Sequence, residues 1–189
     1  MKKIIFICLL CFIIDGALLG QNQAKNILGV SAGIVPGTSD MYFDMPFNFW
    51  PNRELSPICQ VFYARQLTES FRIGSYLEYE KINFTDNVVN DIKNFKRYNL
   101  GLNWLGQYPK TSLHLQLGGY FGYGFLRAQN WDNLTGIDLG LIVGPAYERN
   151  KFGIALHLHG GYAWYKSSGT PIGVMLYNPK ILLKVYYKL

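Results

Sequence analysis

The chain has 189 residues, enough for one domain, and its composition departs from that of soluble proteins. Charged residues make up 16% of it, against roughly 25% in soluble proteins, and aromatic residues also reach 16%. The net charge of +6 comes from scattered basic residues in runs of no more than two, which excludes the basic stripe of a nucleic-acid-binding protein.

The first residues have the pattern of a secretory signal peptide. Two lysines near the start precede the apolar run Ile4–Ile14, and Gly20 precedes the polar Gln21. This run is too short to span a bilayer, which takes roughly 20 residues. We therefore expect a signal peptide over residues 1–20 and one mature domain over residues 21–189. A single cysteine remains after cleavage, so we expect no internal disulfide.

Eight segments of the mature chain alternate apolar and non-apolar residues with period 2, which predicts β-strands with two different faces. They lie at about Ile27–Val35, Pro57–Gln66, Phe71–Lys81, Lys96–Leu105, Ser112–Phe125, Gly136–Tyr147, Phe152–Tyr165 and Met175–Leu189. Short turns about 41 residues apart lie at Leu67–Ser70, Gln107–Lys110 and Glu148–Lys151. Longer connections lie at about Pro36–Ser56, Asn83–Phe95, Leu126–Thr135 and Lys166–Val174. This spacing predicts an all-β fold, an eight-stranded antiparallel up-and-down barrel.

Alternation alone leaves open which face lines the interior, and a soluble barrel of the lipocalin type places the apolar face inside. Three features favour a transmembrane barrel: a glycine-rich non-apolar face, few Lys and Glu for a solvated face, and aromatic residues near both ends of the apolar face. These aromatic residues are Phe71, Trp104, Phe152 and Tyr187 near the short turns, and Tyr79, Tyr98, Tyr123 and Trp164 toward the long connections. We therefore predict an outer-membrane location with the long connections outside. A barrel of eight strands is filled by its own side chains.

The predicted inner face carries charged residues that need partners, because an enclosed unpaired charge is costly. If the second long connection is centred near Val88–Val89, Glu80 faces Arg97 and Glu78 faces Asn99. We expect a structural hydrogen-bonded network in the lumen, and a selective ion path is the alternative. The candidate members are Arg72, Glu78, Glu80, Arg97, Asn99, Asp138, His157, His159 and Lys184, with Lys180 on the same face.

The three histidines are candidates for metal ligands and for catalytic groups. His157 and His159 point the same way, and such a pair suits zinc or copper, but His114 lies two strands away near a short turn. We therefore expect no metal, and neutral histidines bonded to Asn, Tyr or Asp138. A hydrolytic site needs a serine beside a histidine. The residue two places after His157 is a histidine and the one after His114 is Gln116, so we expect no enzyme and no cofactor.

The connection Pro36–Ser56 has the most unusual local sequence, with aromatic residues interleaved among aspartates and prolines. Exposed aromatic residues in quantity often mark a contact surface. The alternative is that this connection folds over the barrel mouth or that its aromatic side chains enter the outer leaflet. The candidate contact residues are Tyr42, Phe43, Phe47, Phe49 and Trp50, with Trp131 from another connection.

The chain resembles the small single-domain outer-membrane β-barrel proteins, the "porin family" or PorT-like barrels of Bacteroidota, similar in architecture to OmpX and the OmpA transmembrane domain. The resemblance covers residues 21–189. It rests on the Gly20-Gln21 junction, on strand Phe71–Tyr79 and on the terminal segment Lys184–Leu189, which resembles the signal read by the barrel-assembly machinery. The name "porin" implies no proven transport.

The resemblance implies a monomer that contacts outer-membrane lipid, and the barrel-assembly machinery during biogenesis. The favoured role is structural, or recognition of an unidentified extracellular ligand or protein through the outer connections, with no nucleic-acid partner. A narrow channel for ions or small solutes is the alternative, and a lipid-modifying membrane enzyme is less favoured.

Overall fold

The computed structural model describes residues 25–36, 41–44, 54–83, 94–109, 111–128, 133–167 and 173–189. The predicted signal peptide lies outside these ranges. The strands are β1 Asn26–Val35, β2 Met41–Asp44, β3 Ser56–Thr68, β4 Phe71–Asn83, β5 Asn94–Tyr108, β6 Leu113–Ala128, β7 Leu134–Arg149, β8 Phe152–Ser167, β9 Gly173–Tyr177 and β10 Lys180–Lys188. In the same ranges, no helix has the length and apolar character needed to cross a membrane.

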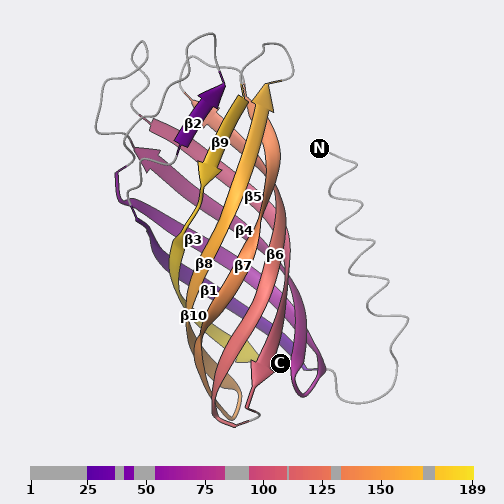
Figure 1. The fold of residues 1–189 in the computed structure, drawn as a ribbon. Coiled ribbons are helices and arrows are strands. Elements are labelled where there is room, and N and C mark those ends of the chain that lie inside the picture. Colours follow the sequence, from indigo (N-terminus) through magenta and orange to yellow (C-terminus); the bar gives the residue numbers. More distant parts are fainter. Residues whose placement is uncertain are drawn as a thin grey trace.

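The strands form one antiparallel sheet that closes on itself (Figure 1). Strands β3 to β8 pair in chain order, β1 pairs with β3, and β10 pairs with both β1 and β8. Strand β2 pairs with β9 beyond the end of the β1–β10 ladder. In the barrel wall, β1 and β2 together therefore take the place of one strand, and β9 and β10 together take the place of another. The wall therefore has eight strands, and the predicted eight-stranded antiparallel barrel is confirmed. We call the end with the short turns the inner end and the opposite end the outer end.

The predicted last strand is interrupted once. Strand β9 ends at Tyr177, which pairs with Tyr162, and β10 begins at Lys180, which pairs with His159 in the same register. Pro179 lies at the interruption, and proline has no backbone N–H to donate to a ladder. The proline thus breaks the hydrogen bonding without shifting the register of the strand.

The expected long connection Pro36–Ser56 contains a strand, so that expectation is wrong in part. Strand β2 pairs antiparallel with β9 over four residues. A stretch this short carries too few residues for a period-2 pattern to stand out from its surroundings. Tyr42 and Phe43, expected as loop contact residues, therefore belong to a paired strand.

The apolar face points outward and the polar face inward. Leu141 in the middle of β7 is 70% exposed, whereas Asp138 on the opposite face of the same strand is fully buried. Burial alternates residue by residue along the whole of β8. This arrangement is the reverse of a soluble ligand-binding barrel and matches a wall that faces lipid.

Glycines on the inner face make room for large side chains in the lumen. A Cβ atom on Gly101 would lie 2.3 Å from Cζ of Tyr76, and one on Gly161 would lie 2.4 Å from the hydroxyl oxygen of Tyr120. Tyr76 and Tyr120 are both almost fully buried. The lumen is therefore packed, as predicted for a barrel of eight strands.

The predicted short turns join neighbouring strands at the inner end. One of them links β7 and β8 through Asn150 and Lys151, between the paired residues Arg149 and Phe152. Asn150 has a φ of 54°, in the left-handed region that asparagine adopts more readily than most residues.

Candidate functional site: the lumen network

Five charged side chains meet in the outer half of the lumen. Glu78 and Glu80 come from β4, Arg97 from β5, Asp138 from β7 and Lys180 from β10. None is more than 4% exposed. Period-2 alternation directs each of them inward, and closure of the sheet brings β10 toward β4 and β7. We call these five residues the outer cluster.

Each cation of the outer cluster bridges carboxylates from different strands. The Arg97 guanidinium lies 2.6 Å from Glu78 Oε1, 2.7 Å from Glu80 Oε2 and 3.2 Å from Asp138 Oδ2. The Lys180 ammonium lies 2.9 Å from Glu78 Oε1 and 3.2 Å from Asp138 Oδ2. These contacts cross the lumen, because β4, β7 and β10 are not neighbours in the wall.

Neutral side chains supply further hydrogen bonds to the carboxylates. Asn99 and Asn178 both donate to Asp138 Oδ2, at 3.0 and 3.2 Å. Gln60 donates to Glu78 Oε2 at 2.5 Å and accepts a hydrogen bond from Ser31 at 3.0 Å. The network thus joins residues of β1, β3, β4, β5, β7 and β10, and it gives the buried charges the partners that they require.

A second group of charges, the inner cluster, closes the inner end of the lumen around Glu148. The Glu148 carboxylate lies 2.5 Å from the Arg72 guanidinium, accepts a hydrogen bond from the Tyr186 hydroxyl at 2.5 Å, and pairs with Lys188. The sequence placed Glu148 in a turn, so its role as the partner of Arg72 was missed. Its even spacing from the inward-facing Ala146 would have identified it.

Two of the histidines join a chain of glutamines at the inner end. His114 lies 3.0 Å from Gln107 and 3.2 Å from Gln116, and His157 Nε2 lies 2.7 Å from Gln116 Oε1. The expectation of Asn, Tyr or Asp138 as partners is therefore wrong. The glutamines were missed because their spacing along the chain shows only that they face inward, not what they meet.

The third histidine, His159, packs against rings. Its ring centroid lies 5.3 Å from that of Tyr120 and 6.0 Å from that of His157. Across the ranges that the structure describes, no three His, Cys, Asp or Glu side chains are grouped as metal ligands would be.

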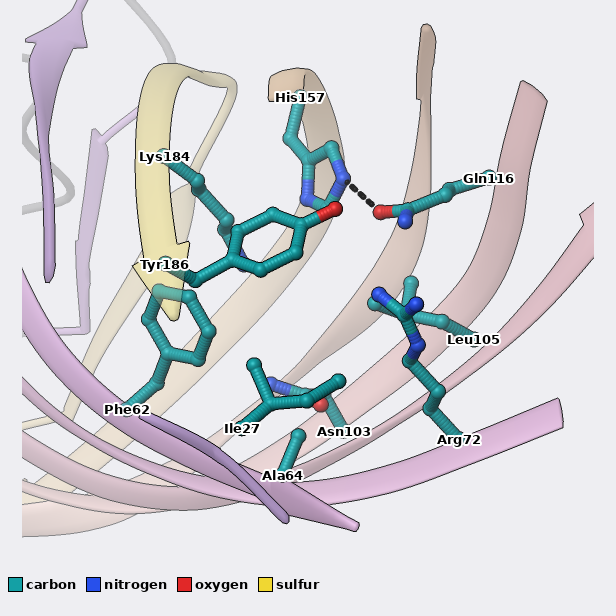
Figure 2. A pocket seen from close by; sticks show the side chains of 10 residues that line it. All are labelled: Ile27, Phe62, Ala64, Arg72, Asn103, Leu105, Gln116, His157, Lys184 and Tyr186. Carbon is teal, nitrogen blue, oxygen red and sulfur yellow. Dashed lines mark hydrogen bonds between the residues drawn. The ribbon is translucent and has the colours of Figure 1, made fainter. Parts of the chain in front are cut away.

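A small cavity lies in the lumen beside Arg72 and Tyr186 of the inner cluster (Figure 2). Its volume is about 20 Å³, room for about one water molecule. The Lys184 ammonium lies 5.0 Å from the centroid of the Phe62 ring, and both side chains line the cavity. The cavity is lined by Ile27, Phe62, Ala64, Arg72, Asn103, Leu105, Gln116, His157, Lys184 and Tyr186.

All nine predicted lumen residues are buried. Arg72 belongs to the inner cluster and four belong to the outer cluster, while Asn99, His157, His159 and Lys184 belong to neither. Glu80 lies opposite Arg97, and Glu78 lies opposite Asn99, so the predicted register is confirmed. The predicted contact residues Phe47, Phe49, Trp50 and Trp131 lie outside the described ranges, as do the side chains of Tyr42 and Phe43.

No family model matches the chain, and no curated protein matches it. Solved structures do. Neisserial surface protein A (NspA) matches with a TM-score of 0.58 and 12% identity, over 89% of this chain and 100% of NspA. The outer membrane protein OprG from Pseudomonas aeruginosa matches with a TM-score of 0.57 and 10% identity, over 90% and 98%. At these identities the likeness shows the fold, that of the small outer-membrane barrels.

Proposed function

We propose that the protein is an integral outer-membrane barrel whose lumen is closed by its own side chains, and that it acts as a structural element or recognises surface partners through its outer connections. The observation that carries this proposal is the pairing of buried charges across the lumen. Arg97 and Lys180 link β4, β5, β7 and β10, and the cavity lined by Arg72, His157 and Lys184 has room for only about one water molecule.

The same pairing argues against a channel for ions or small solutes. An ion crossing the lumen must displace Arg97 or Lys180 from several carboxylates, which leaves buried charges without partners. We expect no stable conductance steps from the refolded barrel in a planar bilayer. Reproducible single-channel steps would contradict the closed lumen and favour the channel.

A lipid-modifying enzyme is the least supported function. Such an enzyme needs its histidine where lipid reaches it, but His114, His157 and His159 are buried in the lumen, and the first two contact glutamines. We expect lipid A from a deletion strain to have the same mass spectrum as that of the parent. A shifted acylation pattern, restored by the wild-type gene, would contradict this view.

We further infer that the chain is related to the porin-family barrels of Bacteroidota, that residues 1–20 are a signal peptide, and that the barrel-assembly machinery is a partner during biogenesis. The terminal segment Lys184–Leu189 supports the last point, because β10 makes the seam with β1 that closes the barrel. Depletion of the assembly machinery should reduce the amount of folded protein. An unchanged folded fraction would contradict it.

Recognition outside the cell is assigned to the aromatic residues of the outer connections. The proposed contact residues are Tyr42, Phe43, Phe47, Phe49, Trp50 and Trp131. Serine substitutions of the last four should abolish capture of a surface partner by the purified barrel while the barrel still folds. Equal capture by the wild-type barrel and the serine variant would contradict a role of these aromatic residues in binding.

A further inference from the structure

Three basic residues form a row on the outward face of the barrel near its outer end. Lys81 on β4 lies opposite Lys96 on β5, and Lys96 lies opposite Arg127 on β6. All three are exposed. Neighbouring strands are about 4.8 Å apart, so the row extends about 10 Å around the barrel. We call these three residues the basic row.

The basic row lies just beyond a row of aromatic residues on the same face. Tyr79, Tyr98 and Phe125 are cross-strand neighbours two residues nearer the middle of each strand, and the rings of Tyr79 and Tyr98 lie 5.2 Å apart. Two residues of a strand span about 7 Å, which the usual tilt reduces to about 5 Å along the bilayer normal. Aromatic girdles mark the head-group level, so the basic row lies among the head groups.

The positive charges of the basic row have no counter-charge from the described part of the chain. No carboxylate in those ranges lies within 4.0 Å of Lys81, Lys96 or Arg127. Glu80, the chain neighbour of Lys81, is buried on the inner face and pairs with Arg97. Like charges directly opposite each other on neighbouring strands repel and destabilise the pairing. An anionic group placed beside the row would remove this cost.

We propose that the basic row binds the phosphate-bearing head group of an outer-leaflet lipid. This inference rests on the proposed membrane location, because the row shares its face with the lipid-facing residues. Tyr98 and Phe125, directly below, are 47% and 41% exposed on that face. A lipid anchored beside them presents its phosphate at the level of the row, whereas a soluble anion gains nothing from the aromatic row. Lysine and arginine both suit phosphate, and Arg127 binds it through two parallel hydrogen bonds.

The test compares two lipids that differ in head-group charge. The folded barrel in detergent is titrated with phosphatidic acid or with phosphatidylcholine of the same acyl chains, and bound lipid is measured by native mass spectrometry. The row variant carries K81Q, K96Q and R127Q. The control variant carries K25Q, R149Q and K151Q, which remove the same charge from exposed positions outside the row. Gel mobility with and without boiling shows that each variant is folded.

We expect wild type to bind phosphatidic acid at least about tenfold more tightly than phosphatidylcholine, since each basic residue near a head group adds to the attraction. The row variant should lose this preference, and the control variant should keep it within about twofold. Equal losses in both variants, or a preference kept by the row variant, would overturn the proposal. Competition by the same concentration of inorganic phosphate would overturn the assignment to a lipid.

The outcome separates this inference from the proposed function. A barrel that fails to insert into phosphatidylcholine vesicles contradicts the membrane location itself. A barrel that inserts, but shows no preference for phosphatidic acid, contradicts only the lipid site.

Discussion

Glu80 and Arg97 face each other across β4 and β5, with a carboxylate oxygen and a guanidinium nitrogen 2.7 Å apart. The same guanidinium lies 2.6 Å from Glu78 and 3.2 Å from Asp138. One cation thus serves three carboxylates. The two members of the pair are therefore not equivalent, and their removal should have different costs.

The substitution R97M should destabilise the barrel more than E80Q. R97M leaves three buried carboxylates without the guanidinium, and loss of one partner from a buried ion pair costs about 3–5 kcal/mol. E80Q leaves Arg97 with two carboxylates and should cost less. The double variant should cost less than the sum of the single variants, because they share an interaction. Denaturant unfolding in detergent measures all three free energies.

A second pair of substitutions provides the control. Glu148 belongs to the inner cluster and contacts Arg72, so E148Q and R97M share no partner. Their effects should add to within about 0.5 kcal/mol. If R97M and E80Q also add, the side chains of Glu80 and Arg97 do not interact in the folded barrel, whatever the register of the strands.

A charge introduced on the outward face should destabilise the barrel more the deeper it lies in the membrane. Leu141 in the middle of β7 is 70% exposed, and L141R should destabilise the folded barrel by about 2–4 kcal/mol. Leu113 is 65% exposed at the inner end of β6, and L113R should cost about 1 kcal/mol or less. Unfolding of both variants in lipid vesicles measures the difference. Equal costs would mean that the two leucines face the same solvent.

Adjacent glycines on β8 should differ in how well they tolerate an added methyl group. A Cβ on Gly161 would lie 2.2 Å from the backbone oxygen of Leu139, whereas a Cβ on Gly160 would meet no atom within 4 Å. We expect G161A to cost about 1–3 kcal/mol through overpacking and G160A to be nearly neutral. Denaturant unfolding of the two variants decides the matter. Similar unfolding free energies for the two variants would show that the lumen side chains rearrange to accommodate the added methyl group.

The facing of the strands was predictable from the sequence because a strand has only two faces and the membrane makes them chemically different. The register of Glu80 with Arg97 was predictable because a hairpin centre fixes every pair along it. Contacts across the lumen were not predictable. Arg97 meets Asp138, and Lys180 meets Glu78, only because closure brings non-neighbouring strands together.

Tight packing was also beyond the sequence. The alternation of β7 predicts that Gly140 lies on the inner face. It does not predict that a Cβ there would lie 2.4 Å from the backbone oxygen of Gly160. Strand β2 was missed because its pairing with β9 depends on the path of the wall beyond the end of β1. The candidate contact residues of the outer connections stay predictions.

The location of the protein gives the most direct test of the whole interpretation. In the closed barrel, backbone groups along the wall pair with neighbouring strands, so the folded protein should stay compact in detergent until it is boiled. We expect the mature chain in the outer-membrane fraction, beginning near Gln21 by N-terminal sequencing, with faster migration on gels before boiling than after. The control is the soluble periplasmic fraction of the same cells, which should lack the band. Recovery from that fraction, or the same mobility with and without boiling, would contradict both the membrane location and the closed barrel.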